Sequence, residues 1–312
     1  MAIVSARPGM GWLPDYRDVR DFVLEEGKPM PKLTAAAKAN KHNEKVVDTY
    51  GMLNKLGMTS PKKRKLKQKV NLREYCSPVE DQGQIGSCTA QAAVAMVEYF
   101  ERRSFGKHID GSRLFVYKVA RNLLHLEGDT GAHLRSAMQA LVLFGVPPEE
   151  YWPYDEDRFD VEPPAFCYSF AQNYQAIRYY RLDTPGTTRK ELLDRIKRTL
   201  ASNLPLMFGF TVYDSIWQVG ADGGIPFPAP NDDIAGGHAL MAVGYDDTVE
   251  IKNPNPGGKR TVGAFIIRNS WGPDWGDGGY GLLPYDYVLQ GLADDWWSLL
   301  KNEWVDSGEF SG

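Results

Sequence analysis

The stretch Gln82-Gly83-Gln84-Ile85-Gly86-Ser87-Cys88-Thr89-Ala90-Gln91 places one cysteine where a glycine-rich turn leads into a run of helix formers. A helix N-terminus has free N–H groups and partial positive charge, so it stabilises a thiolate. The glycines allow a bound chain to approach the backbone closely. Gln82 adds a neutral amide donor upstream. The stretch therefore has the parts that acyl transfer requires: a nucleophile of low pKa beside donors for an oxyanion.

Two later segments supply the other groups that a thiol nucleophile needs. Gly237-His238-Ala239 opens an apolar run, and Asn269-Ser270-Trp271-Gly272 follows another. A histidine can act as general base, and an amide oxygen can orient its ring. A lone buried cysteine or a histidine in a strand is usually structural, but the combination favours Cys88, His238 and Asn269 as catalytic residues.

These elements occur in the same order as in the papain-like (C1-type) cysteine peptidases, and the chain resembles that family over roughly residues 70 to 290. It looks most like a bacterial branch with a short, atypical leader. The resemblance implies an α+β fold in which a helical lobe and an antiparallel β-barrel lobe enclose an active-site cleft. It also implies that Gln82 and the Cys88 N–H form the oxyanion hole, and that Trp271 shields the bond between His238 and Asn269.

The resemblance suggests substrate-binding residues as well. Gly131 lies where relatives hydrogen-bond an extended peptide along an exposed edge. Gly209, Gly237 and Ala239 align with a substrate pocket, and their small size predicts a roomy apolar one. Simple packing within the sheet remains an open alternative for these residues. Ile85 stands where secreted relatives carry a bridged cysteine, so that disulfide cannot form here.

Cysteine content and the N-terminus bear on the compartment. With Cys88 as nucleophile, only Cys76 and Cys167 could pair. Low cysteine use, together with the absence of an apolar signal region near Met1, predicts a cytoplasmic chain, with export by another route left open. No apolar run reaches the ~20 residues of a membrane span. No His/Cys cluster has metal-ligand spacing, so we expect neither a metal nor a cofactor.

Charge divides the chain in two. Residues 1–70 hold 15 Lys/Arg and 7 Asp/Glu, although the whole chain of 312 residues has a net charge of −4. We expect a leader (residues 1–69) that includes a helix over 34–45 and an exposed basic hinge over 61–69. A peptidase domain follows over 70–312, with a helical lobe at about 85–175, a β lobe at about 176–292 and a tail at 293–312. A basic leader on an acidic body predicts mutual attraction.

Local patterns predict the main elements of the domain. Helices are expected where apolar residues recur on one face, over 89–102, 114–126, 134–144 and 188–201. Strands are expected in apolar or alternating runs, over 177–182, 205–212, 239–245, 261–269 and 279–284.

The function predicted from these observations is a cysteine endopeptidase that acts on peptides or proteins. We expect a latent, monomeric precursor whose leader covers the cleft, with Trp12-Leu13-Pro14 as apolar anchors. Two alternatives stay open: a non-catalytic relative that binds peptides, and a thiol acyltransferase such as a transglutaminase. The basic run alone is weak evidence for nucleic-acid binding, so neither a nucleic acid nor a membrane is an expected partner.

Overall fold

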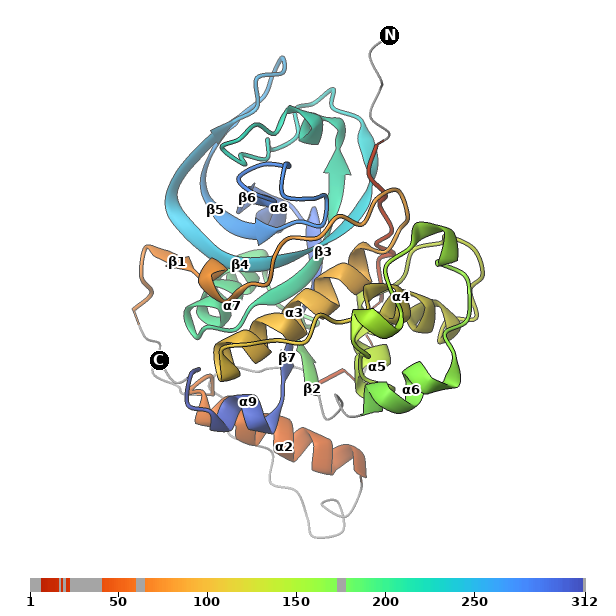
Figure 1. Cartoon of the computed structure of the whole chain (residues 1–312). Helices are drawn as coiled ribbons and strands as arrows, with labels where there is room; N and C mark the ends of the chain where they lie inside the picture. The colour runs from red at the N-terminus through yellow and green to blue at the C-terminus, as the bar shows by residue number, and fades with distance from the viewer. Residues whose placement is uncertain are drawn as a thin grey trace.

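The chain folds into two lobes that meet along one long helix (Figure 1). The structure, a computed structural model, describes residues 7–16, 18, 21–22, 41–59, 65–172 and 178–310. The helical lobe contains α3 (Cys88–Phe105), α4 (Arg113–Asn122), α5 (Leu134–Leu143) and α6 (Ala165–Ala171). Short 3-10 turns lie at Arg73–Tyr75, Glu149–Tyr151, Glu156–Arg158 and Asp214–Gln218.

The ends of the helices follow from local chemistry. α3 has no proline or glycine inside it and ends at Gly106, which adopts the left-handed conformation that glycine tolerates best. The Ser112 side chain accepts a hydrogen bond from the Phe115 N–H and caps α4. Thr188 and Glu191 form a reciprocal capping box at the start of α7 (Arg189–Ala201). The four predicted helices of the domain are therefore confirmed, with shifts of a few residues at their ends.

The second lobe is built on a seven-stranded antiparallel sheet in the order β2-β7-β3-β4-β5-β6, with β1 paired to β4. Its strands are β1 (Lys69–Asn71), β2 (Arg178–Arg181), β3 (Leu206–Tyr213), β4 (Ile234–Lys252), β5 (Arg260–Arg268), β6 (Tyr280–Pro284) and β7 (Ala293–Leu300). α7 and α8 (Asp286–Leu289) complete the lobe. The path ends at β2 and β6, so the barrel implied by the resemblance is not closed. β7 lies inside the sheet, in a region where the sequence predicted a tail.

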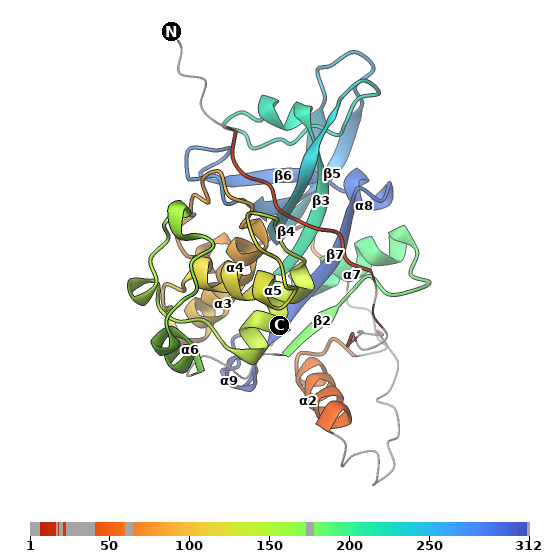
Figure 2. The ribbon, with the colours of Figure 1, turned by 90° about the vertical axis from the view of Figure 1, so that its right-hand side faces the viewer.

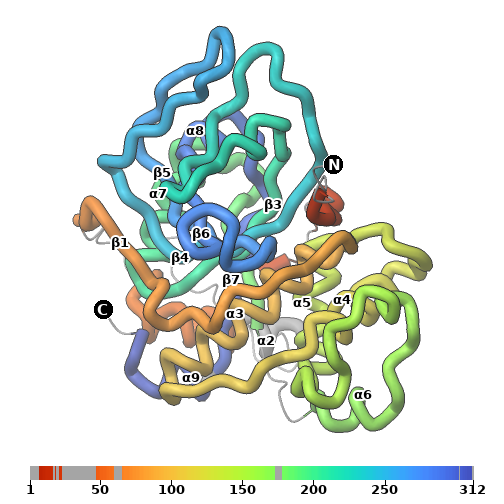
Figure 3. The backbone as a smooth tube through the Cα atoms, turned by 45° about the horizontal axis from the view of Figure 1, so that its top comes forward, coloured from red at the N-terminus to blue at the C-terminus, as the bar shows by residue number. Residues whose placement is uncertain are grey.

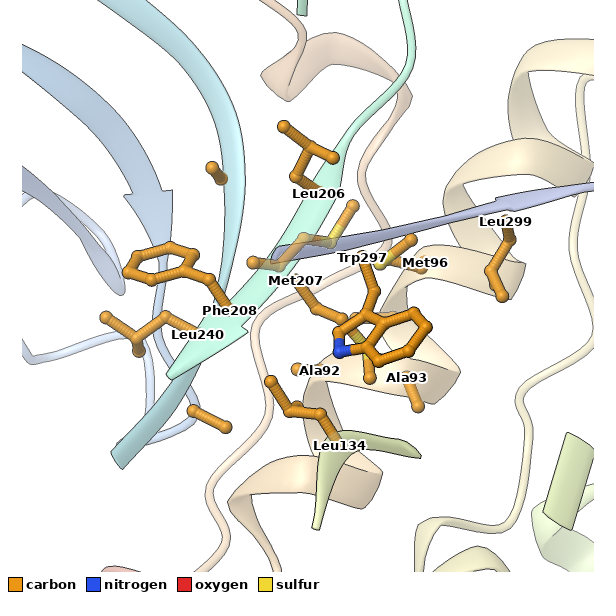
Figure 4. Close-up of a cluster of buried hydrophobic side chains, with 14 of the residues drawn as sticks. Ala92, Ala93, Met96, Leu134, Leu206, Met207, Phe208, Leu240, Trp297 and Leu299 are labelled. Carbon is orange, nitrogen blue, oxygen red and sulfur yellow. The ribbon is translucent and has the colours of Figure 1, made fainter. Parts of the chain in front are cut away.

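The lobes are joined by a continuous core around α3. Figure 3 shows α3 where the lobes meet, and every side chain from Cys88 to Phe100 is buried. In Figure 4, side chains of α3 face side chains of β3, β4 and β7. The labelled residues are Ala92, Ala93, Met96, Leu134, Leu206, Met207, Phe208, Leu240, Trp297 and Leu299. Each large apolar side chain buried here stabilises the fold by roughly 1.5–3 kcal/mol, so the start of α3 is held rigidly.

The leader contacts the body at two separate places. Residues 7–16 run between the lobes, and α2 (Lys41–Lys55) packs near α9 (Asn302–Asp306) and β2. Residues 34–40 of the predicted leader helix lie outside the described residues, and the observed helix begins at Lys41. Residues 61–64 of the predicted hinge also lie outside them, and Lys69 already belongs to β1.

Three further observations concern cysteines, membranes and metals. Cys76, Cys88 and Cys167 are all free and buried, so Cys76 and Cys167 do not pair. Within the described ranges, no helix combines the length and apolar character needed to cross a bilayer. Across the same residues, no group of three or more His, Cys, Asp or Glu side chains could hold a metal ion.

Candidate active site

Cys88 is the first residue of α3 and lies at the junction of the two lobes. Its side chain is fully buried, and its Sγ accepts a hydrogen bond from the Ala239 N–H on β4 at 3.4 Å. The glycine-containing turn ends at Ser87, the N-cap residue of α3. The thiol of the helical lobe is thus held against the residue that follows His238.

His238 is fixed by an amide on one side and an indole on another. Its Nε2 and the Asn269 Oδ1 lie 2.8 Å apart, and its ring stacks on Trp271 with 4.6 Å between centroids and 25° between planes. Asn269 Oδ1 also accepts from the Ser270 N–H at 2.8 Å. Since Nε2 faces an acceptor, it is the protonated nitrogen of the neutral ring, and Nδ1 remains free to act as a base. Nδ1 is buried and has no hydrogen-bond partner among the described residues.

Gln82 lies fully buried beside this pair with both ends of its amide engaged. Its Oε1 accepts from the Ser270 hydroxyl at 2.6 Å, which orients the amide. Its Nε2 donates to the carbonyl oxygens of Ile85 at 2.9 Å and Gly9 at 3.1 Å. A carbonyl oxygen of the leader therefore occupies the donor that was predicted to stabilise an oxyanion.

The residues that bring Gly9 there, residues 7–16, are called the cleft segment. Figure 2 shows this segment passing between the helical lobe and the sheet. It forms a parallel bridge at Trp12 and Ala132, in which the Ala132 N–H donates to Gly11 O at 2.9 Å and the Leu13 N–H donates to Ala132 O at 3.1 Å. On the other side, the Trp12 N–H donates to Gly237 O at 3.1 Å. The cleft segment is thus bonded to both lobes.

Three of the predicted substrate-binding residues, Gly131, Gly209 and Gly237, lie against the cleft segment. Gly131 has φ +75° and faces the Gly11 carbonyl so closely that a Cβ atom would overlap it. A Cβ atom on Gly209 would overlap the Trp12 ring. Gly237 contacts Trp12, and Ala239 is the buried residue that donates to Cys88. The Trp12 ring therefore lies where a substrate pocket was predicted, and its surroundings include a polar group, since the Trp12 indole Nε1 donates to Asp295 Oδ2 at 3.3 Å.

Burial controls the ionisation of Cys88 and His238 in the form with the cleft segment in place, which is called the closed form. Removal of water raises the pKa of Cys88 to about 11, although the N–H groups of Ala239 and Gly11 act to lower it. Burial lowers the pKa of His238 to about 4, against the opposing effect of its hydrogen bond to Asn269. The sequence predicted a thiol of low pKa at this helix start, and that prediction is wrong for the closed form because desolvation outweighs the helix N-terminus.

The sequence reasoning missed two groups at the site. Asp295 was assigned to a tail, although a pair of carboxylates directly before Trp296-Trp297 was a visible sign of a polar group entering a core. Asp129 joins the two edges of the cleft, because its Oδ1 accepts from the Gly86 N–H at 2.8 Å and from the Tyr117 hydroxyl at 2.5 Å. The Tyr117 hydroxyl in turn accepts from the Gly131 N–H at 3.1 Å.

Sequence comparisons with known proteins point to one family. A family model described as the papain family cysteine protease matches residues 66–292. The chain is 35% identical over 294 residues to an uncharacterized peptidase C1-like protein, L477, of Acanthamoeba polyphaga mimivirus, covering 91% of this chain and 83% of the viral protein. It is 30% identical to cathepsin K of Gallus gallus over 67% of this chain and 55% of the cathepsin.

Solved structures give the same result. The structure of xylellain, a cysteine protease from Xylella fastidiosa, matches with a TM-score of 0.69 and 32% identity, covering 94% of this chain and 96% of that one. The proform of the ragweed pollen cysteine protease Amb a 11 matches with a TM-score of 0.56 and 25% identity, covering 77% of this chain and 68% of that one.

Proposed function

The chain belongs to the papain family of cysteine proteases, and we propose that it is a cysteine endopeptidase kept latent by its own cleft segment. The observation that carries the proposal is the hydrogen bond from Gln82 Nε2 to Gly9 O, beside Cys88 and the His238–Asn269 pair. One set of groups suited to peptide hydrolysis is assembled in the cleft, and a piece of the same chain occupies it.

In the proposed acylation step, the Cys88 thiol transfers its proton to His238 Nδ1, and the sulfur attacks a substrate carbonyl carbon. The C–S bond forms while the carbonyl electrons move onto oxygen, where Gln82 Nε2 and the Cys88 N–H donate to the oxyanion. Collapse of the tetrahedral intermediate breaks the C–N bond. His238 returns its proton to the leaving amine, and an acyl-thioester on Cys88 remains.

Deacylation follows the same geometry with water as the nucleophile. His238 takes a proton from water, the hydroxide adds to the thioester carbonyl, and the same donors stabilise the second oxyanion. The C–S bond then breaks, and the thiolate recovers a proton from His238. Asn269 holds the His238 ring, and Trp271 covers the hydrogen bond between His238 and Asn269. The Nδ1 atom of His238 therefore keeps its direction through both steps.

The cleft segment fits the role of an inhibitor that is not itself cut. A backbone N–H of the segment, that of Gly11, acts on the Cys88 sulfur. The Cys88 sulfur therefore faces a hydrogen-bond donor of the cleft segment. Nucleophilic attack would require a carbonyl carbon at that position instead. With Gly9 O on Gln82 and Trp12 in the pocket, a substrate can enter only after the segment leaves. These contacts of Trp12 support the expectation that Trp12-Leu13-Pro14 anchors the leader.

The substrate class, the oligomeric state, the position of cleavage and the compartment are proposed on the same basis. Peptides or proteins are the substrates, the enzyme acts as a monomer, and internal bonds are cut. We place the enzyme in the cytoplasm, with export by a route other than the general secretory one left open.

The test compares the intact chain, the chain lacking residues 1–16, and the same shortened chain with Cys88→Ala. Residues 41–59 are kept because Met52, Leu53 and Leu56 are buried and their loss would disturb the fold. We expect the shortened chain to hydrolyse a fluorogenic peptide and to be labelled once by an epoxide thiol inhibitor. The intact chain should do neither efficiently, and Cys88→Ala should abolish both.

Other outcomes of this test discriminate between the functions. Equal activity in the intact and shortened chains would exclude latency. Labelling without hydrolysis, together with transfer of the acyl group to an added amine, would favour the acyltransferase. Peptide binding with neither labelling nor turnover would favour a non-catalytic binding protein.

A further inference from the structure

The turn that carries both proposed oxyanion donors is closed by a hydroxyl group from another loop. The Tyr154 hydroxyl donates to the Gln82 backbone carbonyl oxygen at 2.9 Å and lies 2.7 Å from Ser87 Oγ. Tyrosine has one hydroxyl proton and a carbonyl oxygen can only accept, so it is the Ser87 hydroxyl that donates to Tyr154. One side chain therefore joins the two ends of the turn, beside the Gln82 amide at one end and the Cys88 N–H at the other.

Ser87 gives up a common role to make this contact. It is the N-cap residue of α3, where a serine side chain usually accepts a hydrogen bond from a backbone N–H of the first helical turn. The Ser87 side chain makes no such capping bond, although it is fully buried. A local rule broken directly before Cys88 indicates that the hydroxyl serves another purpose there.

The Gln82 residue is held from both lobes, and Tyr154 is the contact of the helical lobe with its backbone carbonyl. On the side of the β lobe, the Gln82 N–H donates to Ser270 O at 2.8 Å, and Gln82 Oε1 accepts from the Ser270 hydroxyl at 2.6 Å. Without the Tyr154 hydroxyl, Gln82 would follow Ser270, whereas Cys88 would follow α3. The hydroxyl therefore controls the distance between the two proposed donors.

The segment around Tyr154 is itself anchored to the same turn. Tyr154 lies between the 3-10 turns Glu149–Tyr151 and Glu156–Arg158. Glu156 Oε2 accepts from the Gln84 N–H at 2.7 Å, in the middle of the turn. Residues 154–156 thus support the turn at its beginning, middle and end.

We propose that Tyr154 is a positioning residue for the oxyanion hole, because its hydroxyl holds the Gln82 amide where this amide and the Cys88 N–H can donate to one oxygen. This inference rests on the proposed peptidase function and adds a residue that acts through Gln82. A preorganised donor stabilises the transition state more than the bound substrate. Its displacement should therefore lower kcat rather than raise KM.

The test uses the full chain with Gly11→Val and Trp12→Ala, which opens the cleft and keeps the whole leader. A Cβ atom at Gly11 would lie 1.9 Å from the Gly86 carbonyl oxygen, and this backbone cannot turn aside as a flexible side chain can. Adding Tyr154→Phe removes one hydroxyl. We expect kcat for a fluorogenic peptide to fall about tenfold, a part of the 100-fold or more that loss of an entire oxyanion donor costs. KM should change by less than about twofold.

Two reagents separate the position of the oxyanion donors from general packing. The Cys88 thiol adds across the carbonyl of a peptide aldehyde, and the resulting oxygen needs the same donors as the transition state, so the inhibition constant should rise about tenfold. Alkylation by iodoacetamide displaces iodide from a CH₂ group and forms no oxyanion, so its rate at Cys88 should stay within about twofold. Tyr151→Phe, at a side chain 39% exposed, is the matched control and should change none of these values.

A measurement on the chain with an intact leader does not depend on activity. The Gln82 Nε2 group is buried and donates to Ile85 O and Gly9 O, so its protons should exchange slowly with solvent. NMR of a chain labelled at the glutamine side-chain nitrogen measures this exchange, and the signal is assigned by its loss in Gln82→Glu. Tyr154→Phe should speed the exchange several-fold, and Tyr151→Phe should leave it unchanged.

The failures are distinct. An unchanged kcat in the opened chain, or unchanged exchange in the closed chain, would overturn the role of Tyr154. Equal falls in kcat and in the rate of alkylation would overturn it as well, since they would show a loss of packing around Cys88. Alkylation of Cys88 in the opened chain without hydrolysis of any peptide would overturn the proposed function, and the exchange measurement would still decide whether Tyr154 positions Gln82.

Discussion

The chemistry of the closed site depends on a few buried contacts around Gln82. Its Oε1 accepts from Ser270, and the adjacent Asn269 accepts from His238. The groups that orient the proposed oxyanion donor and the proposed base, Ser270 and Asn269, are therefore neighbouring residues of one turn after β5. A movement of this turn would affect both functions together.

Gln82→Glu tests the donor at nearly constant shape. The carboxylate keeps the bond to the Ser270 hydroxyl, but it cannot donate to the oxyanion and adds negative charge beside it. We expect kcat to fall by about 100-fold or more with a small change in KM, measured in the chain lacking residues 1–16. Ser270→Ala keeps the donor and should cost much less. Similar losses for both variants would show that Gln82 acts only through packing.

The reactivity of Cys88 should depend on pH in a way that reports closure. Its pKa of about 11 and the His238 pKa of about 4 mean that a neutral thiol and a neutral imidazole coexist between these values. Only on the order of 1 in 10⁴ thiols is ionised at pH 7 for such a pKa. Without residues 1–16, water reaches the sulfur and the pKa should fall.

Iodoacetamide alkylation followed by peptide mass mapping measures this difference. In the intact chain, the rate at Cys88 should rise only as the pH approaches 11, and in the shortened chain it should rise at lower pH. The buried Cys76 provides an internal control in both. The same midpoint in the two chains would contradict an effect of the cleft segment on ionisation.

At the scale of elements, Asp129 and Tyr117 join the turn before Cys88 to the loop at Gly131, which is the proposed substrate-binding edge. The Gly86 N–H donates to Asp129, which accepts from Tyr117, and the Tyr117 hydroxyl accepts from the Gly131 N–H. No disulfide joins these loops, since all three cysteines are free. The hydrogen-bonded chain therefore sets the width of the cleft on the helical side.

Tyr117→Phe removes the middle of that chain. Two hydrogen bonds are lost, and a buried Gly131 N–H loses its acceptor, so we expect a loss of about 1–3 kcal/mol in the free energy of unfolding. Because the proposed substrate-binding edge would move, KM should rise several-fold more than kcat falls, as measured with the shortened chain. Tyr168→Phe, whose hydroxyl contacts the exposed Glu162, is the control. An equal effect of both variants on KM would exclude a positioning role.

The elements also show what sequence patterns can predict. α3, α4, α5 and α7 were predictable because caps and apolar periodicity are local signals, and motifs singled out Cys88 and His238 as candidate catalytic residues. β7 was missed because all its residues from Asp295 to Leu300 are buried, so it lacks the alternation of a half-buried strand. The contact between Trp12 and Asp295 spans 283 residues, and no local pattern encodes a pairing at that distance.

At the scale of the whole molecule, the ion pairs between leader and body do not all have the leader as the positive partner. The sequence predicted a basic leader attracted to an acidic body, and Lys55 with Asp306 at 2.7 Å follows that rule. At the cleft the signs are reversed, since Arg135 of the body contacts Asp15 at 2.5 Å and also pairs with Asp21. Overall charge therefore does not explain docking, which depends on specific pairs and on Trp12.

Attachment at two places has a consequence for activation. Lys65 is exposed between the two leader anchors and the domain, so limited trypsin treatment of the Cys88→Ala chain should cut there first. Because the cleft segment and α2 both retain their contacts, we expect the cut leader to remain bound during gel filtration. With Trp12→Ala, one anchor is lost and more leader should dissociate, by about tenfold for each 1.4 kcal/mol removed. Tyr16→Ala, at a side chain 93% exposed, is the matched control. Release of the leader from the unsubstituted chain directly on cutting would show that the connection through residues 60–68, rather than the two contact regions, holds the leader in place.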